Sequence, residues 1–209
     1  MAVDRIAFRE AMAHLGAAVN IITTDGPGGR CGFTASAVCS LTDDPATVIV
    51  CMSRSSTQNA AFKENGVICI NTLTARQQEL SDIFAGRRNL SMPERFASAT
   101  WSTLATGAAV LDEALLSLDC EIVQYNDFGT HSLFVCRVAA LTPARDESAL
   151  IYFGRAFHAI QKPAPADERF MGNRSERSNF SKGICVKAAP IPKRIYPLAA
   201  IATRSGVSR

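Results

Sequence analysis

The 209-residue chain has one tryptophan and three histidines, and it lacks an apolar run long enough to span a bilayer. Its seven cysteines form no CxxC pair and show no spacing typical of a zinc site. The few histidines belong to no recognisable Ser/His/Asp or Cys/His arrangement. The sequence therefore predicts no metal site and no membrane span, and it offers no obvious nucleophile or catalytic base.

Cysteine, with seven residues, is more frequent in this chain than histidine or tryptophan. Five cysteines lie inside apolar, strand-like runs, namely Cys39, Cys51, Cys69, Cys120 and Cys136. We expect them to act as small buried hydrophobic residues in a reducing compartment. The first residues carry charges and include no apolar signal-peptide core, so we expect a cytoplasmic protein.

Charge is distributed unevenly along the chain. Residues 1–161 contain 12 Lys/Arg and 16 Asp/Glu, whereas residues 162–209 contain 10 and 3. The second segment is also rich in proline and small polar residues. We therefore predict one domain over residues 1–161 and a basic, largely disordered extension over 162–209. Nucleic-acid binding by that extension is the less favoured alternative, because no motif or interleaved aromatic residues support it.

Apolar periodicity and turn residues predict a chain dominated by strands. An amphipathic helix over residues 4–15 should pack on the domain. We expect strands at 17–24, 31–40, 46–53, 67–73, 115–125, 131–142 and 149–153, helices at 55–66 and 75–86, and a loop with a helical turn at 87–99. Strands separated by turns, with helices inserted, favour a small antiparallel barrel over a doubly wound sheet.

Hydroxyl side chains gather in one region of the sequence. The two-residue period of a strand puts Thr34, Ser36 and Ser40 on one face. Residues 53–57, Ser-Arg-Ser-Ser-Thr, come directly before the predicted helix. A phosphate group needs several hydrogen bonds, which hydroxyls, helix-start N–H groups and one Arg supply. The pattern indicates a flat compound with a phosphate, although a solvent-exposed strand and an ordinary helix cap would look the same.

Two later stretches hold polar residues beside glycine. In "DFGTH", residues 127–131, a plain β-turn with an incidental histidine is the simpler interpretation. In "YFGRAFH", residues 152–158, the aromatic residues suit a core, while Arg155 and His158 are candidate ligand contacts. Trp101 is expected to be a core anchor rather than a stacking platform.

These stretches together resemble the short-chain flavin reductases of two-component monooxygenases. The resemblance spans about residues 5–161 and is carried by residues 18–73, by "FGTHSLFVCRV" and by "LIYFGRAFHAI". The chain is similar to the reductase component of 4-hydroxyphenylacetate 3-monooxygenase, which is the function we favour here. It is also similar to the flavin reductase of uracil degradation, which is the alternative.

The resemblance implies a split β-barrel of the FMN-binding type, a homodimer, and transfer of a hydride from NADH or NADPH to FMN or FAD. The reduced flavin would then diffuse to a partner monooxygenase. No acid or base is required, because the cofactors carry the chemistry. A flavin-binding module without turnover and an oxidase of phosphorylated pyridoxine are the competing functions.

The resemblance also assigns site residues by position. The expected flavin site comprises Thr34, Ala35, Ser36, Ser40, Ser53, Arg54, Ser55, Ser56, Arg155 and His158, with Phe84, Ala85 and Gly86 as weaker candidates. The expected nicotinamide contacts are Gly129 and His131. They belong to a Gly-Asp-His signature of the family in which Thr130 here replaces the Asp.

Overall fold

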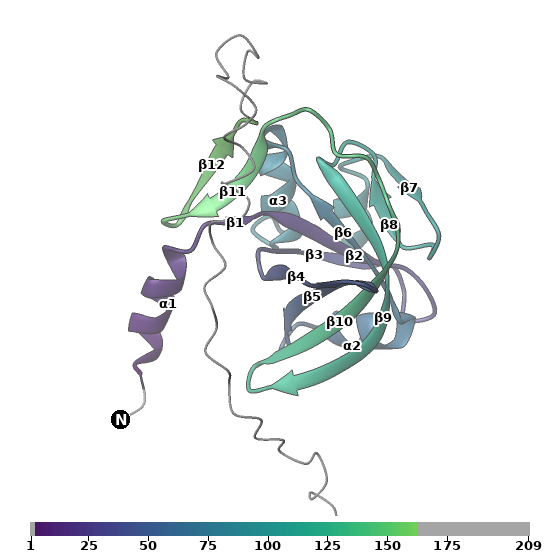
Figure 1. Ribbon diagram of the computed structural model, residues 1–209, viewed down its shortest axis with the longest axis horizontal. Coiled ribbons are helices and arrows are strands. Elements are labelled where there is room, and N and C mark those ends of the chain that lie inside the picture. The colour runs from purple at the N-terminus through teal and green to yellow at the C-terminus, as the bar shows by residue number, and fades with distance from the viewer. Residues whose placement is uncertain (1–2, 163–209) are drawn as a thin grey trace, which may run out of the picture. The chain divides into compact units, whose positions relative to one another are not determined.

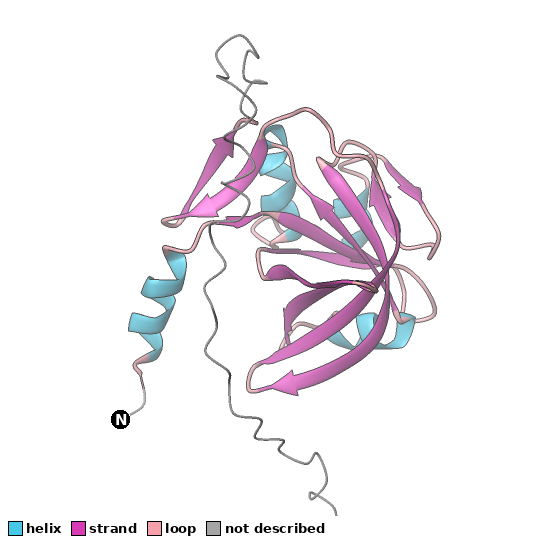
Figure 2. Ribbon diagram, in the orientation of Figure 1, coloured by secondary structure: helices cyan, strands magenta, loops and turns pink. Residues whose placement is uncertain are grey.

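The computed structural model describes residues 3–162, and strands dominate this part of the chain (Figures 1 and 2). The main sheet is antiparallel, with seven strands in the order β3-β2-β6-β9-β10-β5-β4. They are β2 (Asn20–Thr24), β3 (Cys31–Ala35), β4 (Val38–Asp43), β5 (Ala46–Ser53), β6 (Val67–Thr72), β9 (Leu116–Phe128) and β10 (His131–Leu141). The predicted mostly-β class with inserted helices is therefore confirmed.

The main sheet curls so that its two edges approach each other. The edge strands β3 and β4 lie at opposite ends of the strand order, yet only Ser36 and Ala37 separate them in the chain. Such a link spans at most about 11 Å from Ala35 to Val38. No strand pairing joins β3 to β4 among the described residues, so the sheet is not closed into a barrel.

The continuous strand predicted over residues 31–40 is wrong. The chain leaves β3 after Ala35 and enters β4 on the other edge of the sheet. At the crossing, Val38 N donates to Ser36 O at 3.0 Å, and Cys51 N donates to Ala37 O at 3.0 Å. Thr34 and Ser40 therefore belong to different strands and do not share one face.

Two smaller sheets and four short helical segments add to the main sheet, besides an N-terminal helix. The strands β1 (Ala17–Ala18), β11 (Ala149–Phe153) and β12 (Ala156–Ile160) form one sheet, and β7 (Trp101–Thr103) pairs with β8 (Ala109–Leu111). The segments are α2 (Asn59–Asn65), the 3-10 turn η1 (Ala75–Gln77), α3 (Gln78–Phe84) and α4 (Met92–Phe96). Strands β7, β8 and β12 are absent from the sequence prediction because each is short and lacks a long apolar period.

The two largest groups of buried apolar residues form most of the core. Inside the curled sheet, Phe62 of α2 packs near Phe134, with ring centroids 6.4 Å apart. Beside α3 and α4, the rings of Phe84, Phe96 and Trp101 pack together, and Trp101 Nε1 donates to Phe96 O at 2.9 Å. The prediction of Trp101 as a core anchor is confirmed.

Helix α1 (Arg5–Ala13) forms as predicted, but its packing differs from the prediction. Asp4 caps it, because the Asp4 carboxylate accepts from Ile6 N at 2.9 Å and Ala7 N at 2.8 Å. None of its residues is buried, and Phe8 is 56% exposed. The helix stands apart from the main sheet in Figure 1. The expected packing of this helix on its own domain is therefore wrong.

Four of the six described cysteines are buried, and all six are free thiols. Burial raises the pKa of Cys120 and of Cys136 to about 12, so both stay protonated at neutral pH. Cys51 is half-buried. Cys39 is exposed on the edge strand β4, which corrects its expected burial.

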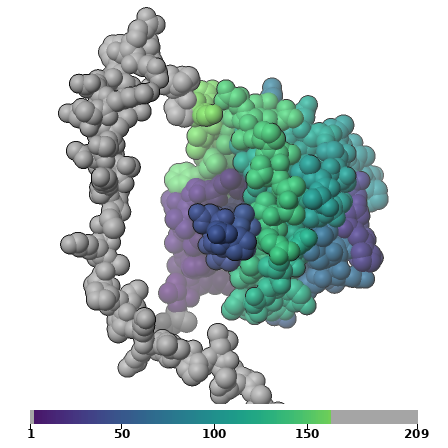
Figure 3. Space-filling view, turned by 45° about the vertical axis from the view of Figure 1, so that its right-hand side comes forward, coloured from purple at the N-terminus to yellow at the C-terminus, as the bar shows by residue number. Residues whose placement is uncertain are grey.

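The space-filling view adds the shape of one face. There, the dark blue atoms of the β4–β5 hairpin stand out from the surrounding surface (Figure 3). None of the described helices is long and apolar enough to cross a membrane. The predicted basic extension lies outside the described residues apart from Lys162.

Candidate functional site

A hollow between β3, α3 and the β11–β12 hairpin collects three of the predicted flavin contacts. Its volume is about 260 Å³. It is lined by Val19, Thr34, Ala35, Ser36, Ser81, Asp82, Ala85, Arg87, Tyr152 and Phe157. We call it the β3–α3 hollow. The structure thus brings Thr34, Ala35 and Ser36 together with Ala85, which the resemblance offered only as a weaker candidate.

The hydroxyl groups in this hollow differ in what they can offer a ligand. Thr34 Oγ1 already donates to Ser81 O in α3 at 2.6 Å. Its oxygen can still accept a hydrogen bond, but its proton is committed. Ser36 is exposed, and its hydroxyl has no hydrogen-bond partner among residues 3–162. Ser36 is therefore the hydroxyl donor in the hollow.

Four lining residues carry chemistry that the sequence analysis missed. Arg87 Nη1 donates to Asp82 Oδ1 at 2.9 Å, and the Arg87 guanidinium lies 5.9 Å from the Phe157 ring centroid. Tyr152 and Phe157 are paired across the β11–β12 hairpin, with ring centroids 5.3 Å apart. The aromatic rings suit a flat ligand and the cation suits negative charge on it.

The second group of predicted residues lies at the end of β5. Residues 53–57, which we call the serine turn, begin with the last residue of β5 and continue as turns and a bend rather than as the first residues of a helix. Helix α2 begins at Asn59, has Gln58 as its N-cap and makes no side-chain capping bond. The predicted start of this helix at residue 55 is therefore wrong, while Gly66 ends the helix as predicted, with φ 68°.

The structure brings the serine turn against the tip of the β9–β10 hairpin, residues 128–131. Ser53 and His131 are partners in the β5–β10 ladder. Arg54 N donates to Thr130 O at 2.9 Å, and Arg54 Nη1 donates to Gly129 O at 3.0 Å. The predicted phosphate contacts and the predicted nicotinamide contacts are thus neighbours, although more than seventy residues separate them in the chain.

Thr130, which replaces the Asp of the family signature, lies beside the imidazole of His131. Its Oγ1 lies 2.9 Å from His131 Nδ1, within hydrogen-bond distance. When Thr130 donates, His131 carries its proton on Nε2, the nitrogen that points away from Thr130. Gly129 has φ 53°, a conformation that glycine adopts without strain. The hairpin tip is accordingly short and fixed, and it presents an exposed imidazole.

Three predicted flavin contacts lie in neither the β3–α3 hollow nor the serine turn. Ser40 is exposed on the edge strand β4. Arg155 has φ 64° in the β11–β12 turn, and its Nη2 donates to Glu10 Oε1 at 2.5 Å. His158 Nε2 lies 3.1 Å from Phe153 O, on the face of β12 opposite to Phe157. Within one chain these residues are separate from Thr34, Ala35 and Ser36.

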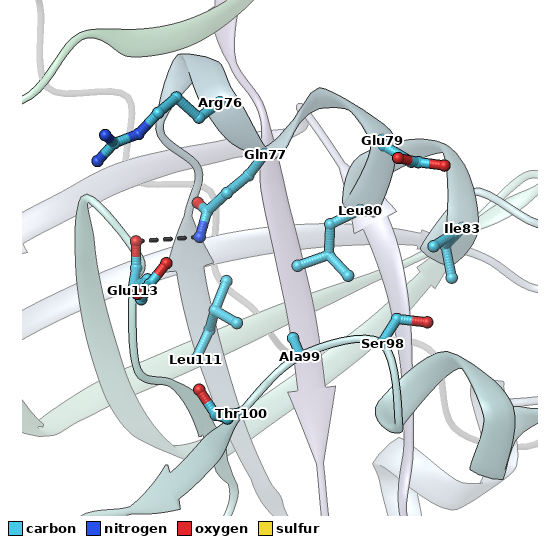
Figure 4. A pocket seen from close by; sticks show the side chains of 10 residues that line it. All are labelled: Arg76, Gln77, Glu79, Leu80, Ile83, Ser98, Ala99, Thr100, Leu111 and Glu113. Carbon is cyan, nitrogen blue, oxygen red and sulfur yellow. Dashed lines mark hydrogen bonds between the residues drawn. The ribbon is translucent and has the colours of Figure 1, made fainter.

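A larger hollow, of about 580 Å³, lies elsewhere and contains none of the predicted residues. In Figure 4, Leu80, Ala99 and Leu111 point toward its middle, and Gln77 donates to the backbone oxygen of Glu113. Its one cation, Arg76, is already paired with Glu147 at 2.5 Å. Size alone would select this hollow, but two carboxylates, Glu79 and Glu113, line it and would repel a phosphate. We therefore assign the candidate site to the β3–α3 hollow and the serine turn.

No group of His, Cys, Asp and Glu residues that could hold a metal ion occurs within residues 3–162. The donor set of the candidate site is instead hydroxyls, backbone N–H groups, two guanidinium groups and aromatic rings. These groups fit an aromatic ring system with an anionic arm.

Comparisons with known proteins agree with this chemistry. Residues 12–161 match the family model described as "Flavin reductase like domain". The protein named FMN reductase (NADH) RutF of Klebsiella pneumoniae (strain 342) is 52% identical over 161 residues, covering 77% of this chain and 97% of that protein.

Solved structures show the same relationship. A crystal structure from Haemophilus somnus 129PT, named as a flavin reductase, has a TM-score of 0.72 and 44% identity, covering 76% of this chain and 100% of that one. BorF, the flavin reductase component of a bacterial two-component tryptophan halogenase, has a TM-score of 0.70 and 25% identity, covering 77% and 100%. The resemblance stated from the sequence is confirmed: the chain belongs to the flavin reductase like domain family.

Proposed function

We propose that this chain is an NADH-dependent FMN reductase that supplies reduced flavin to a separate partner enzyme. The observation that carries the proposal is the meeting of the serine turn with the β9–β10 tip, where Arg54 bonds to Gly129 and Thr130. One short surface then offers hydroxyls for a phosphate and an imidazole for a nucleotide. The names of two relatives, FMN reductase (NADH) and flavin reductase component, support the same reaction.

The comparisons support a partner enzyme of the uracil-degrading type, which was the alternative, better than one of the 4-hydroxyphenylacetate type, which was favoured. Relatives at 49 to 52% identity are named RutF, the flavin reductase of uracil degradation. The expected 4-hydroxyphenylacetate type has weaker support. We therefore propose that the partner is a monooxygenase of the uracil-degrading type.

Different residues of this chain would contact the flavin ring, its phosphate and the nicotinamide nucleotide. The bound flavin supplies the chemistry, since its N5 accepts a hydride from nicotinamide C4. Tyr152 and Phe157 would flank the ring, Ser36 would donate to its polar edge, and Arg87 would favour negative charge there. Ser53, Ser55 and Ser56 would hold the phosphate, and His131 would contact the nicotinamide nucleotide.

We also propose that the chain is a homodimer. Helix α1 leaves Phe8 and Met12 exposed at helical spacing, and Leu15 is exposed just beyond its end. Leu41 is exposed on the projecting β4–β5 hairpin. Apolar side chains so arranged on separate elements are typical of a protein interface. We propose that a second copy would bring Arg155 and His158 of one chain toward the site of the other, since neither residue lines the β3–α3 hollow of its own chain.

The test is to mix the purified chain with NADH and FMN and to follow the nicotinamide absorbance band. We expect NADH to be oxidised only when flavin is added, with FAD, riboflavin and NADPH assayed in parallel. FMN binding without NADH oxidation would instead identify a storage or sensing module. Oxidation of phosphorylated pyridoxine by oxygen would identify the other competing function.

A further inference from the structure

Asp127, beside the serine turn, has no role in the function proposed above. It lies near the end of β9, where its carboxylate accepts from Ser132 Oγ at 2.6 Å and from Lys63 Nζ at 3.1 Å. Its Oδ2 is also 3.4 Å from Arg54 Nε. One carboxylate thus holds a cation from α2 and another from the serine turn.

The Arg54 side chain is held from a second direction as well. Its Nη1 donates to Gly129 O at 3.0 Å, while its Nε faces Asp127. The remaining nitrogen, Nη2, has no partner among residues 3–162. A planar guanidinium fixed on two sides presents its remaining N–H groups in one direction, which is the geometry that phosphate recognition needs.

A buried layer beneath these contacts connects the same two segments. Ser132 is fully buried and Asn59 is 7% exposed. Asn59 Nδ2 donates to Ser132 Oγ at 3.1 Å and to Ser53 O at 3.4 Å. Because Ser132 in turn donates to Asp127, the β9–β10 tip and the serine turn are joined from inside as well as through Arg54.

These contacts provide orientation rather than stability. The Arg54 side chain is 51% exposed and the Asp127 side chain 35%, so water and salt screen their attraction. The pKa of Asp127 lies below its usual value, chiefly because of the hydrogen bond from Ser132 and then that from Lys63. The carboxylate is therefore charged at neutral pH and holds Arg54 in place without contributing much to the free energy of unfolding.

We infer that Asp127 is a positioning residue that aims the Arg54 guanidinium at the phosphate of bound FMN and fixes the hairpin tip that carries His131. This inference rests on the proposed function. A carboxylate close to a phosphate also repels it, and that effect has the opposite sign. Removing the charge of Asp127 therefore shows whether its positioning of Arg54 or its repulsion of the phosphate has the larger effect on FMN binding.

The experiment compares FMN with riboflavin, which lacks the phosphate. Asp127→Asn keeps an oxygen that can accept from Ser132, so the local packing is retained. We expect its Kd for FMN to rise about fivefold, while its Kd for riboflavin stays the same. Its KM for NADH should rise as well, with a smaller change in kcat at saturating substrates. Unchanged riboflavin binding and an unchanged unfolding midpoint show that the variant is folded.

Two further variants sharpen the result. Glu121→Gln removes the carboxylate of the Arg137–Glu121 pair on the same hairpin, at 2.5 Å, and should leave both Kd values unchanged. Arg54→Gln should raise the Kd for FMN, and adding Asp127→Asn to it should change nothing further. Additive effects, tighter FMN binding by Asp127→Asn, or equal shifts for both flavins would overturn the inference.

FMN and riboflavin binding by the native chain distinguishes a failure of this inference from a failure of the proposed function. If the native chain binds FMN and riboflavin equally well, the proposed phosphate site is wrong and the role of Asp127 is wrong with it. If it prefers FMN and Asp127→Asn keeps that preference in full, only the role of Asp127 is wrong.

Discussion

At the scale of single residues, the hydroxyls of the candidate site are not interchangeable. Thr34 has its proton committed to Ser81 O, whereas Ser36 is exposed. In the serine turn, Ser53 Oγ and Ser55 Oγ lie 2.9 Å apart and share one proton between them. A bound anion can accept hydrogen bonds from the remaining donors of the turn. A substitution that adds negative charge to the turn therefore tests whether the phosphate binds there.

Ser55→Asp should weaken FMN binding about tenfold, because it puts a negative charge beside the phosphate. Riboflavin binding should not change. Isothermal titration or quenching of flavin fluorescence measures both. Ser102→Asp adds the same charge to an exposed position of β7 and is the matched control. An unaltered affinity for FMN in Ser55→Asp would exclude the phosphate from the serine turn.

His131→Ala should raise the KM for NADH about tenfold and that for FMN much less, since the imidazole is proposed to contact the nicotinamide nucleotide. Thr130→Val removes the hydrogen bond to His131 Nδ1 and should produce a smaller change of the same kind. Steady-state kinetics with each substrate varied in turn gives both constants. A change confined to the flavin constant would assign His131 to the flavin instead.

At the scale of elements, one buried amide joins four strands. Asn71 of β6 is fully buried, donates to Ile21 O at 3.1 Å, and accepts from Leu111 N and Ser117 Oγ at 2.8 Å each. These partners lie on β2, β8 and β9. Loss of the amide would leave several buried polar groups without partners, which costs far more than one exposed hydrogen bond.

Asn71→Ala should therefore destabilise the fold by about 3 kcal/mol. For a chain of this size, that corresponds to a fall in Tm of about 10 °C. Circular dichroism on heating measures it. Asn126→Ala, on an exposed position of β9, is the control and should shift Tm by no more than about 1 °C. Equal melting of the two variants would contradict the role of the buried amide.

The elements also show what the sequence could predict. Strands β5, β6, β9 and β10 were predicted because their apolar runs are long and end at turn residues. The break at Ser36 and Ala37 was not predicted, because no glycine or proline marks it. The pairing of Tyr152 with Phe157 follows from a two-residue turn and was within reach. Asp82 and Arg87 were not, since only tertiary folding brings the end of α3 to β3.

At the scale of the whole molecule, the exposed apolar face of α1 is the feature that a single chain leaves unexplained. Phe8 is 56% exposed and Met12 is 44% exposed. The helix touches its own chain through Gly154 N, which donates to Ala13 O at 2.7 Å, and through the Arg155–Glu10 pair. A helix held at one end in this way is well placed to reach across to a second copy.

The double variant Phe8→Glu, Met12→Glu should convert the proposed dimer to a monomer, because charge in a buried interface is costly. Sedimentation velocity or light scattering gives the mass. Leu104→Glu introduces the same charge at another exposed apolar residue and should leave the mass unchanged. A dimer that survives the double variant would move the interface away from α1.

The two-residue passage between β3 and β4 also limits how this site can diversify. Ser36 and Ala37 alone cross from one margin of the sheet to the other, and the hydrogen bond from Val38 N to Ser36 O fixes their turn. An added residue there would shift Thr34 and Ala35 relative to α3, and a deleted one would pull the margins out of register. The ligand preference of such a protein can therefore change through substitutions in the site. Insertions or deletions in this two-residue crossing would instead disrupt the site.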